Sequence, residues 1–163
     1  MLEGTRRCPA QLRGEIASAL RVVFARKGCV REVESSNDAT PATDSLVLRV
    51  LVDDYKEETR WDIGLIERAQ PMGGHDPALD SQVVLDVTAQ VELRAGPERP
   101  PVRLKTFAAH VSRSPRAPGE DAVSGARSVL VDKIVREAHG LVCKGSRRTL
   151  SREIEQAFAP PAR

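Results

Sequence analysis

SQVVLDVTAQVELR, residues Ser81–Arg94, is the most regular segment of the sequence. Apolar and polar residues alternate along it, and only Val84 breaks the pattern. The alternating apolar positions are Val83, Leu85, Val87, Ala89, Val91 and Leu93. Because successive side chains of a strand point to opposite faces, this segment has one face to bury and one that tolerates water. The pattern predicts an antiparallel strand that is covered on one side only.

Less regular strands are predicted on either side of this segment. Ser45–Asp62 begins with SLVLRVLV, which is apolar in both phases, as expected of a more central strand. It then turns polar, and we expect the polar half to extend past the sheet as one arm of a long hairpin. In Val102–Ser112 the apolar phase changes near Thr106, which predicts a bulge there. A short extended segment over Cys29–Glu34 would add a fourth strand.

Helical periodicity appears before and after the strands. Gln11–Lys27 is followed by Gly28, a typical residue just beyond a helix end, and its apolar stripe is Leu12, Ile16, Ala19, Leu20, Val23 and Phe24. A second helix is predicted after Glu120 and Asp121, since acids favour a helix start. Its stripe is Val123, Ala126, Leu130, Ile134, Ala138 and Leu141. The segment TLSREIEQAF predicts a short third helix, with Leu150, Ile154, Ala157 and Phe158 on one face.

These elements predict an α+β fold. We expect a two-layer sandwich: an antiparallel or mixed sheet of three to four strands, two main helices packed on one face, and a short C-terminal helix. With 163 residues and 40% hydrophobic residues, the chain fits one such domain. We assign that domain to residues 11–145, a disordered or vector-derived start to 1–10, and the C-terminal helix and tail to 146–163. Ser35–Asp44 and Ile63–Asp80 are rich in turn formers and are expected to be loops.

Charge and hydropathy argue against a nucleic-acid partner and against a membrane-spanning segment. The 25 basic and 23 acidic residues nearly balance and are spread along the chain, which argues against a nucleic-acid binder. No apolar run approaches the roughly 20 residues that a membrane-spanning helix needs. The sequence therefore predicts neither nucleic-acid binding nor a transmembrane segment.

The chemistry-bearing residues form no catalytic pattern. The acidic cluster Asp53–Glu58 lacks the alternate ligands and central glycine of a calcium loop. His75, His110 and His139 lie far apart in the sequence, and no nucleophile motif is present. We predict no catalytic, metal or cofactor site and interpret the chain as a non-enzyme.

A basic strip on the outer face of the sheet is the main candidate contact surface. Arg103 and Lys105 alternate with apolar residues, and Arg49 and Arg94 occupy comparable positions on neighbouring strands. The strip could bind an anionic lipid headgroup or an acidic partner, but cross-strand pairing with nearby acids such as Asp86 and Glu92 explains it without any ligand, and we favour that pairing. The aromatic residues Tyr55 and Trp61 are further candidate partner contacts.

The three cysteines, Cys8, Cys29 and Cys143, match no zinc spacing. Cys8 and Cys29 flank one helix of about 25 Å and cannot pair with each other. Cys29 and Cys143 each follow or end a predicted main helix. If those helices run parallel on one sheet face, these ends meet and a Cys29–Cys143 disulfide can form; if antiparallel, they lie far apart.

ALRVVFARKGCVREVE, a polar loop, and then DSLVLRVLVDDY resemble a recurring pattern of bacterial envelope lipoproteins. SQVVLDVTAQVELR, VRLKTFAAHVSRSP and DAVSGARSVLVDKIVREA are similar to later parts of the same pattern. The group includes the lipopolysaccharide-assembly lipoprotein LptE, auxiliary lipoproteins of ABC-type transporters, and relatives of the TolB amino-terminal domain.

The resemblance implies a non-catalytic periplasmic accessory domain that assists an envelope transport or assembly complex by binding a protein or an anionic lipid. It also implies an outer-membrane anchor through a lipid attached upstream. The contact region would be the exposed sheet face, an edge strand or Ile63–Asp80. The alternative interpretation is a cytosolic structural or assembly subunit, such as a phage-tail-like component or a scaffold.

Overall fold

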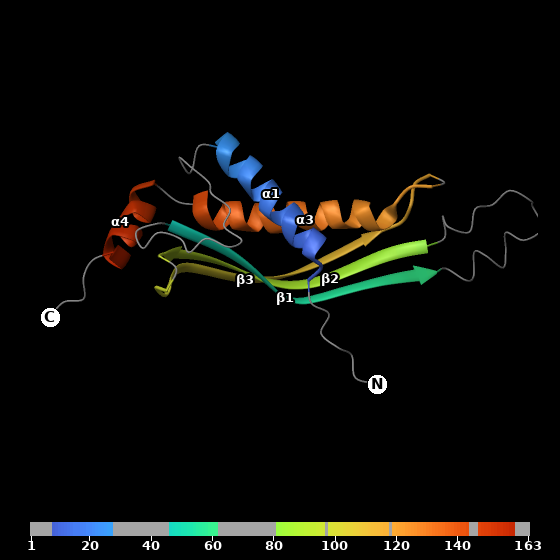
Figure 1. Ribbon diagram of the computed structural model, residues 1–163, viewed down its shortest axis with the longest axis horizontal. Coiled ribbons are helices and arrows are strands. Elements are labelled where there is room, and N and C mark those ends of the chain that lie inside the picture. The colour runs from blue at the N-terminus through green and yellow to red at the C-terminus, as the bar shows by residue number, and fades with distance from the viewer. Residues whose placement is uncertain are drawn as a thin grey trace, which may run out of the picture.

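The computed structural model describes residues 8–27, 46–61, 81–96, 98–117, 119–143 and 147–158. The predicted strand at Cys29–Glu34 and the predicted loops Ser35–Asp44 and Ile63–Asp80 lie outside these residues. Within them, three helices and a three-stranded antiparallel sheet form the α+β fold that the sequence predicts (Figure 1).

The sheet is a meander in the order β1-β2-β3, so the regular segment of the sequence forms the central strand. The strands are β1 (Leu46–Trp61), β2 (Ser81–Ala95) and β3 (Pro101–Arg113). Both pairings are antiparallel, and Val87 lies between Tyr55 on β1 and Ala109 on β3. Gly96 follows β2 with a φ of 106°, a conformation that glycine adopts without steric cost.

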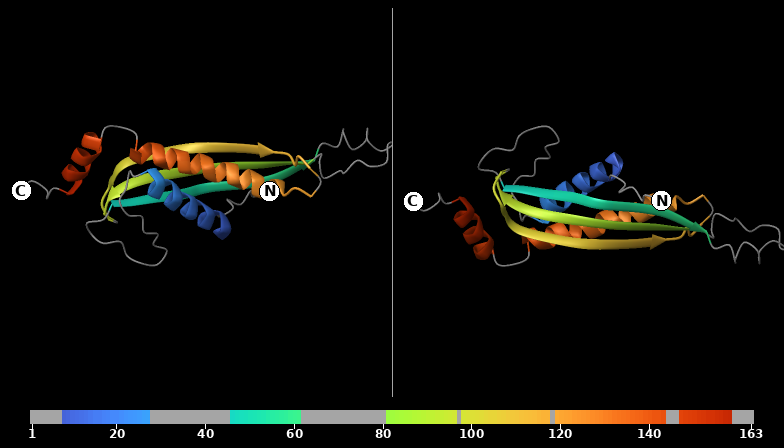
Figure 2. Two further views of the ribbon diagram at one scale, coloured as in Figure 1. Left: turned by 90° about the horizontal axis from the view of Figure 1, so that it is seen from above. Right: turned by 90° about the horizontal axis from the view of Figure 1, so that it is seen from below.

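Helices α1 (Ala10–Lys27) and α3 (Ala122–Cys143) lie on one face of the sheet. They run in the same direction, and α1 crosses α3 at an angle (Figures 1 and 2). Asp121 Oδ1 caps α3 by accepting hydrogen bonds from the backbone nitrogens of Val123 and Ser124, at 3.0 and 3.1 Å. The short helix α4 (Arg147–Phe158) sits at the end of the sheet, near the end of α3.

The core lies between β2 and the two long helices. Alternate residues of β2 are buried under α3, and they include Leu85, Ala89 and Val91, each with no exposed surface. Leu12 of α1 and Leu130 and Ile134 of α3 are equally buried. Each of these leucine, isoleucine and valine side chains contributes about 1.5–3 kcal/mol when removed from water. The stripe predicted for each helix therefore faces the sheet.

The phase of β3 differs from the prediction. Its odd-numbered residues from Arg103 to Val111 face the helices without a break, because each lies opposite a helix-facing residue of β2. The irregularity in the pairing lies at the start of β3, opposite the step from Leu93 to Arg94. The bulge predicted near Thr106 is therefore wrong.

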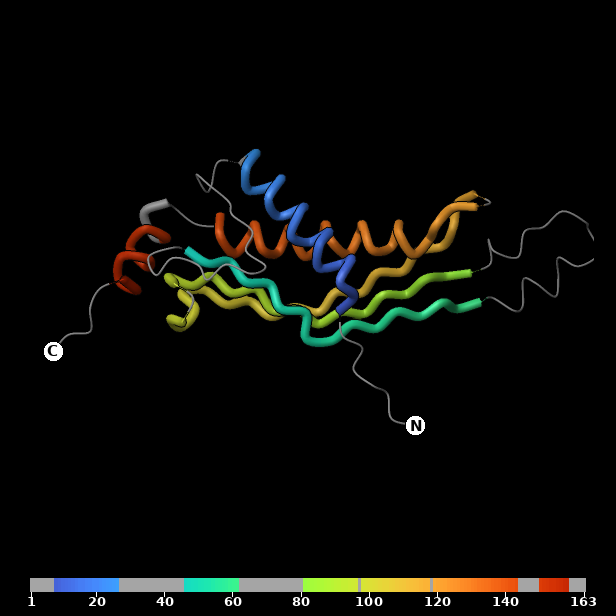
Figure 3. Tube along the Cα trace, in the orientation of Figure 1, coloured from blue at the N-terminus to red at the C-terminus, as the bar shows by residue number. Residues whose placement is uncertain are grey.

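The polar half of β1 also differs from the prediction, since it stays paired with β2 as far as Trp61 opposite Ser81. A register shift between Val52 and Asp54 leaves Asp53 as an extra residue. The trace of β1 has a step near its middle (Figure 3). Because one extra residue reverses which side chains face the core, Tyr55 points toward the helices.

Candidate functional site

The face of the sheet turned away from α1 and α3 carries no described helix (Figure 2, right). We call it the open face. It presents Arg49, Leu51, Asp54 and Lys56 of β1, Asp86, Thr88, Gln90, Glu92 and Arg94 of β2, and Leu104, Thr106, Ala108 and His110 of β3. Acidic and basic side chains alternate across it, so it is a mixed polar surface.

Glu92 is a buried acidic residue on the open face. Only 4% of this residue is exposed, and its carboxylate accepts hydrogen bonds of 2.7 Å from both Arg94 Nε and Gln90 Nε2. The hydrogen bond from Arg94 is the main reason that the pKa of Glu92 lies below its usual range, and the charge of Arg49 adds to it. Arg49 and Arg94 therefore do share this face, as predicted, but as partners of a buried carboxylate.

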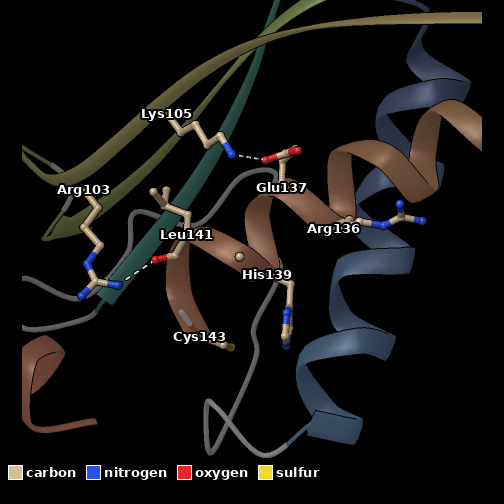
Figure 4. A pocket seen from close by; sticks show the side chains of 8 residues that line it. Arg103, Lys105, Arg136, Glu137, His139, Leu141 and Cys143 are labelled. Atoms are coloured by element: carbon tan, nitrogen blue, oxygen red, sulfur yellow. Dashed lines mark hydrogen bonds and ion pairs between the residues drawn. The ribbon is translucent and has the colours of Figure 1, made fainter. Parts of the chain in front are cut away.

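Arg103 and Lys105 do not lie on the open face, which corrects the predicted four-residue strip. Arg103 donates to the Leu141 carbonyl at 2.8 Å and to Glu153 at 2.7 Å, and Lys105 pairs with Glu137 of α3 (Figure 4). Both side chains line a cavity of about 620 Å³ at the end of α3. They face the helices because they lie opposite Leu93 and Val91, two helix-facing residues of β2, and in phase with Ala109.

The two candidate aromatic contacts have opposite environments. Trp61 is 54% exposed at the end of β1, which leaves it accessible. Tyr55 is only 3% exposed, and its hydroxyl donates to Glu57 at 2.5 Å. Arg127 of α3 donates to the same carboxylate at 2.9 Å. Tyr55 is therefore a core residue rather than a partner contact.

The buried position of Tyr55 predicts an alkaline limit to stability. Burial, and then the hydrogen bond to Glu57, raise the pKa of Tyr55 to about 12. Because the unfolded value is about 10, the neutral phenol stabilises the fold fully below pH 10, and this contribution is lost as the pH rises toward 12. We expect about 1 kcal/mol to be lost by pH 11, a figure reduced for the partial exposure of the neighbouring ion pair. Tyr55 is the sole tyrosine, so tyrosinate absorbance reports it directly.

A Glu57→Gln variant is the matched control for this titration. Its amide has no charge to oppose the tyrosinate, so the pKa of Tyr55 should fall toward 10 while circular dichroism shows an intact fold. If Tyr55 of the folded parent protein titrates near pH 10, as it does in urea, the assignment of Tyr55 to the core is contradicted.

Each edge strand of the described sheet has one feature that opposes strand addition. Lys133 of α3 donates to the carbonyl oxygen of His110 at 2.7 Å, which occupies a backbone acceptor of β3. On β1 the extra residue Asp53 interrupts the regular ladder. Charged side chains and bulges at edges oppose pairing with another strand. The open face is therefore a better candidate contact surface than either edge.

The described residues hold no group of three or more His, Cys, Asp or Glu side chains placed to bind a metal ion. His110 lies beside Asp86 on the open face, with Nδ1 and Oδ1 2.6 Å apart, while His139 packs against Phe24. His75 lies outside the described part of the chain. None of the described helices is long and apolar enough to cross a membrane.

The cysteines divide into one free thiol and one disulfide-bonded residue in the described chain. Cys8 is free and half-buried, and burial raises the pKa of its thiol. Cys143 is disulfide-bonded. Cys29, the partner predicted for it, lies outside the described residues, so the pairing stays a prediction. The condition set for that pairing is met, because α1 and α3 run in the same direction and Phe24 and Val142, near their ends, share one buried cluster.

Sequence reasoning named Glu92 only as an acid that pairs with the basic strip, and it missed Leu104 as part of the contact surface. The spacing Gln90, Glu92, Arg94 on a single strand face was a visible signal for the place of Glu92 on this surface. Leu104 looked like a core residue, yet it is 53% exposed on the open face.

No family model matches this sequence, and no curated protein gives a match either.

Proposed function

We propose that this chain is a non-catalytic accessory domain of the bacterial periplasm that assists an envelope transport or assembly complex by docking onto it, with an outer-membrane lipid anchor attached upstream. The observation that carries the proposal is the open face, where exposed side chains are held in fixed positions and no described helix covers them. A surface of this kind recognises a partner by shape and charge, without catalysing a reaction.

The open face suits a protein partner better than an anionic lipid. Arg94 is paired with Glu92, and Arg49 lies close enough to feel the same carboxylate, so part of their positive charge is already balanced and less of it is open to a lipid headgroup. Leu104 adds an exposed apolar side chain beside this charged group, opposite Glu92 in the register. An apolar contact surrounded by ordered charges is typical of protein interfaces, in which the charges set specificity more than affinity.

The disulfide supports the periplasm over the cytosolic alternative. Structural disulfides persist in oxidising compartments and are rare in the cytosol. Cys143 is disulfide-bonded and packs against the cluster of Phe24, Leu93 and Val142, where it belongs to the structural core rather than to an exposed redox site. A scaffold or phage-tail-like subunit working in the cytosol would not be expected to keep such a bond.

A Leu104→Glu substitution should prevent docking without unfolding the domain. It places a second carboxylate opposite Glu92 and removes the apolar contact. We expect tagged parent protein to recover an envelope complex from detergent-solubilised membranes, and the variant to recover at least tenfold less. Quantitative mass spectrometry of the eluates measures the difference.

Val22→Glu is the matched control, because Val22 is similarly exposed, at 46%, but lies on α1. This variant should recover the complex at the parent level. Equal losses for both substitutions would contradict a site on the open face. Recovery of cytosolic proteins alone by the parent protein would contradict the envelope function itself.

A further inference from the structure

Helix α4 is held at the end of the sheet by a small set of side-chain contacts (Figure 1). Arg103 Nε donates to Glu153 at 2.7 Å. Arg99 donates to the carbonyl oxygen of Ala157 and stacks over Phe158, with its guanidinium carbon 5.2 Å from the ring centroid. The apolar side of α4 enters through Leu150, which packs against a buried cluster.

The surface that α4 covers is formed by residues outside α4, and contacts within the rest of the domain hold it in place. We call it the α4-binding surface and define it by Arg99, Arg103, Phe24, Leu93 and Val142. The guanidinium of Arg103 is anchored by the Leu141 carbonyl at 2.8 Å, and the backbone oxygen of Arg99 accepts a hydrogen bond of 3.0 Å from Arg94. Because these anchors come from α3 and β2, the side chain of Arg103 and the backbone of Arg99 keep them when α4 is absent, and such preorganisation lowers the cost of binding.

The attachment of α4 itself is weak. It has 12 residues, and helices shorter than about 12–15 residues are marginal in water without packing. Its ion pair with Arg103 is partly solvated, since the Glu153 side chain is 36% exposed, and pairs of this kind contribute little. A competing helix with the same contacts could therefore replace α4.

We propose that the α4-binding surface is a docking site for a helix of a partner protein, and that α4 occupies this site in cis. The contacts of α4 define the ligand: an apolar residue, a glutamate three positions later, and an aromatic residue eight positions after the first, where the helix ends. Arg103 selects the glutamate, while Arg99 satisfies a carbonyl at the helix C-terminus. The proposal adds a second contact surface to the docking function proposed above and rests on that function.

A fluorescent peptide with the sequence of residues 147–158 provides the test. It is titrated into the full chain and into a Leu150→Ala/Glu153→Ala variant, whose own α4 has lost two of its contacts with the α4-binding surface. Fluorescence anisotropy should show at least tenfold tighter binding to the variant than to the parent. Adding Arg103→Gln to that variant should return the affinity to the parent level, and Arg99→Gln should do the same by a separate contact.

Glu155→Ala is the matched control, because Glu155 lies exposed on α4 and makes none of these contacts. It should bind the peptide no better than the parent. If the variant with the loosened α4 binds no tighter than the parent, or if neither arginine matters, the docking site is overturned. That failure would not touch the envelope function, which the recovery of a membrane complex tests independently.

Discussion

Leu85→Ala should lower the free energy of unfolding by about 3 kcal/mol. Leu85 has no exposed surface and lies in the middle of β2, opposite Glu57 and Val111 and beneath the helices. Truncation removes buried apolar surface and leaves a cavity that the neighbouring strands cannot close. Urea denaturation followed by circular dichroism measures the loss, and the melting temperature should fall by roughly 10 °C.

The same substitution at Leu104 shows how the open face differs from the face that the helices cover. Leu104 is 53% exposed on the open face, so Leu104→Ala should change stability by no more than about 0.5 kcal/mol. The contrast between two leucines of one sheet tests which face the helices cover. Comparable losses at both positions would mean that the open face is buried, and would remove the basis of the docking proposal.

The fold was predictable because its main elements have strong periodicity. The alternation over Ser81–Arg94 predicted the strand β2, and the structure extends it only to Ala95. The more central position was predicted for Ser45–Asp62 and is wrong, because β1 lies at an edge of the described sheet. The stripe over Gln11–Lys27 predicted α1 within one residue, since the apolar spacing and Gly28 mark its extent. Patterns of this kind depend on burial of a whole face, which a single residue rarely overrides.

The orientation of individual polar residues was not predictable to the same degree. Arg103 and Lys105 face the helices near the end of the sheet, where their long side chains reach the Leu141 carbonyl and the carboxylates of Glu137 and Glu153. Such a position is compatible with a charge because the stem packs while the charged end finds a partner. Nothing in the local sequence specifies partners that lie 32 to 50 positions away.

Bulges are the second reason that side-chain orientations could not be predicted from the sequence. Tyr55 sits two residues after the extra residue Asp53, and that single insertion turns it from an outward contact into a core side chain. The sequence shows polar residues around this point but does not fix where the ladder slips. A one-residue shift reverses every side chain that follows it, so the candidate contact residues were least certain where they follow an irregularity.

Removing the predicted Cys29–Cys143 disulfide should have an effect as large as the loss of a core leucine. The bond would close a loop of roughly 110 residues, for which restriction of the unfolded chain gives about 4–5 kcal/mol. Removal of a native disulfide usually costs about 2–5 kcal/mol. Cys143 is disulfide-bonded at the end of α3, close to where α1 ends. Urea denaturation of a Cys29→Ser/Cys143→Ser variant, compared with the oxidised parent, measures the difference.

Cys8→Ser is the control for this pair, because Cys8 is free and half-buried. It should leave the disulfide intact and change stability by less than about 1 kcal/mol. Intact mass under non-reducing conditions should be lower than the fully reduced mass by two hydrogens in the parent and in Cys8→Ser alike, and titration in denaturant should find a thiol only in the parent. Three titratable thiols in the purified parent would contradict the pairing. They would also remove the strongest support for an oxidising compartment, which is the disulfide itself. The parallel packing of α1 and α3 would then hold these helix ends together without a covalent bond.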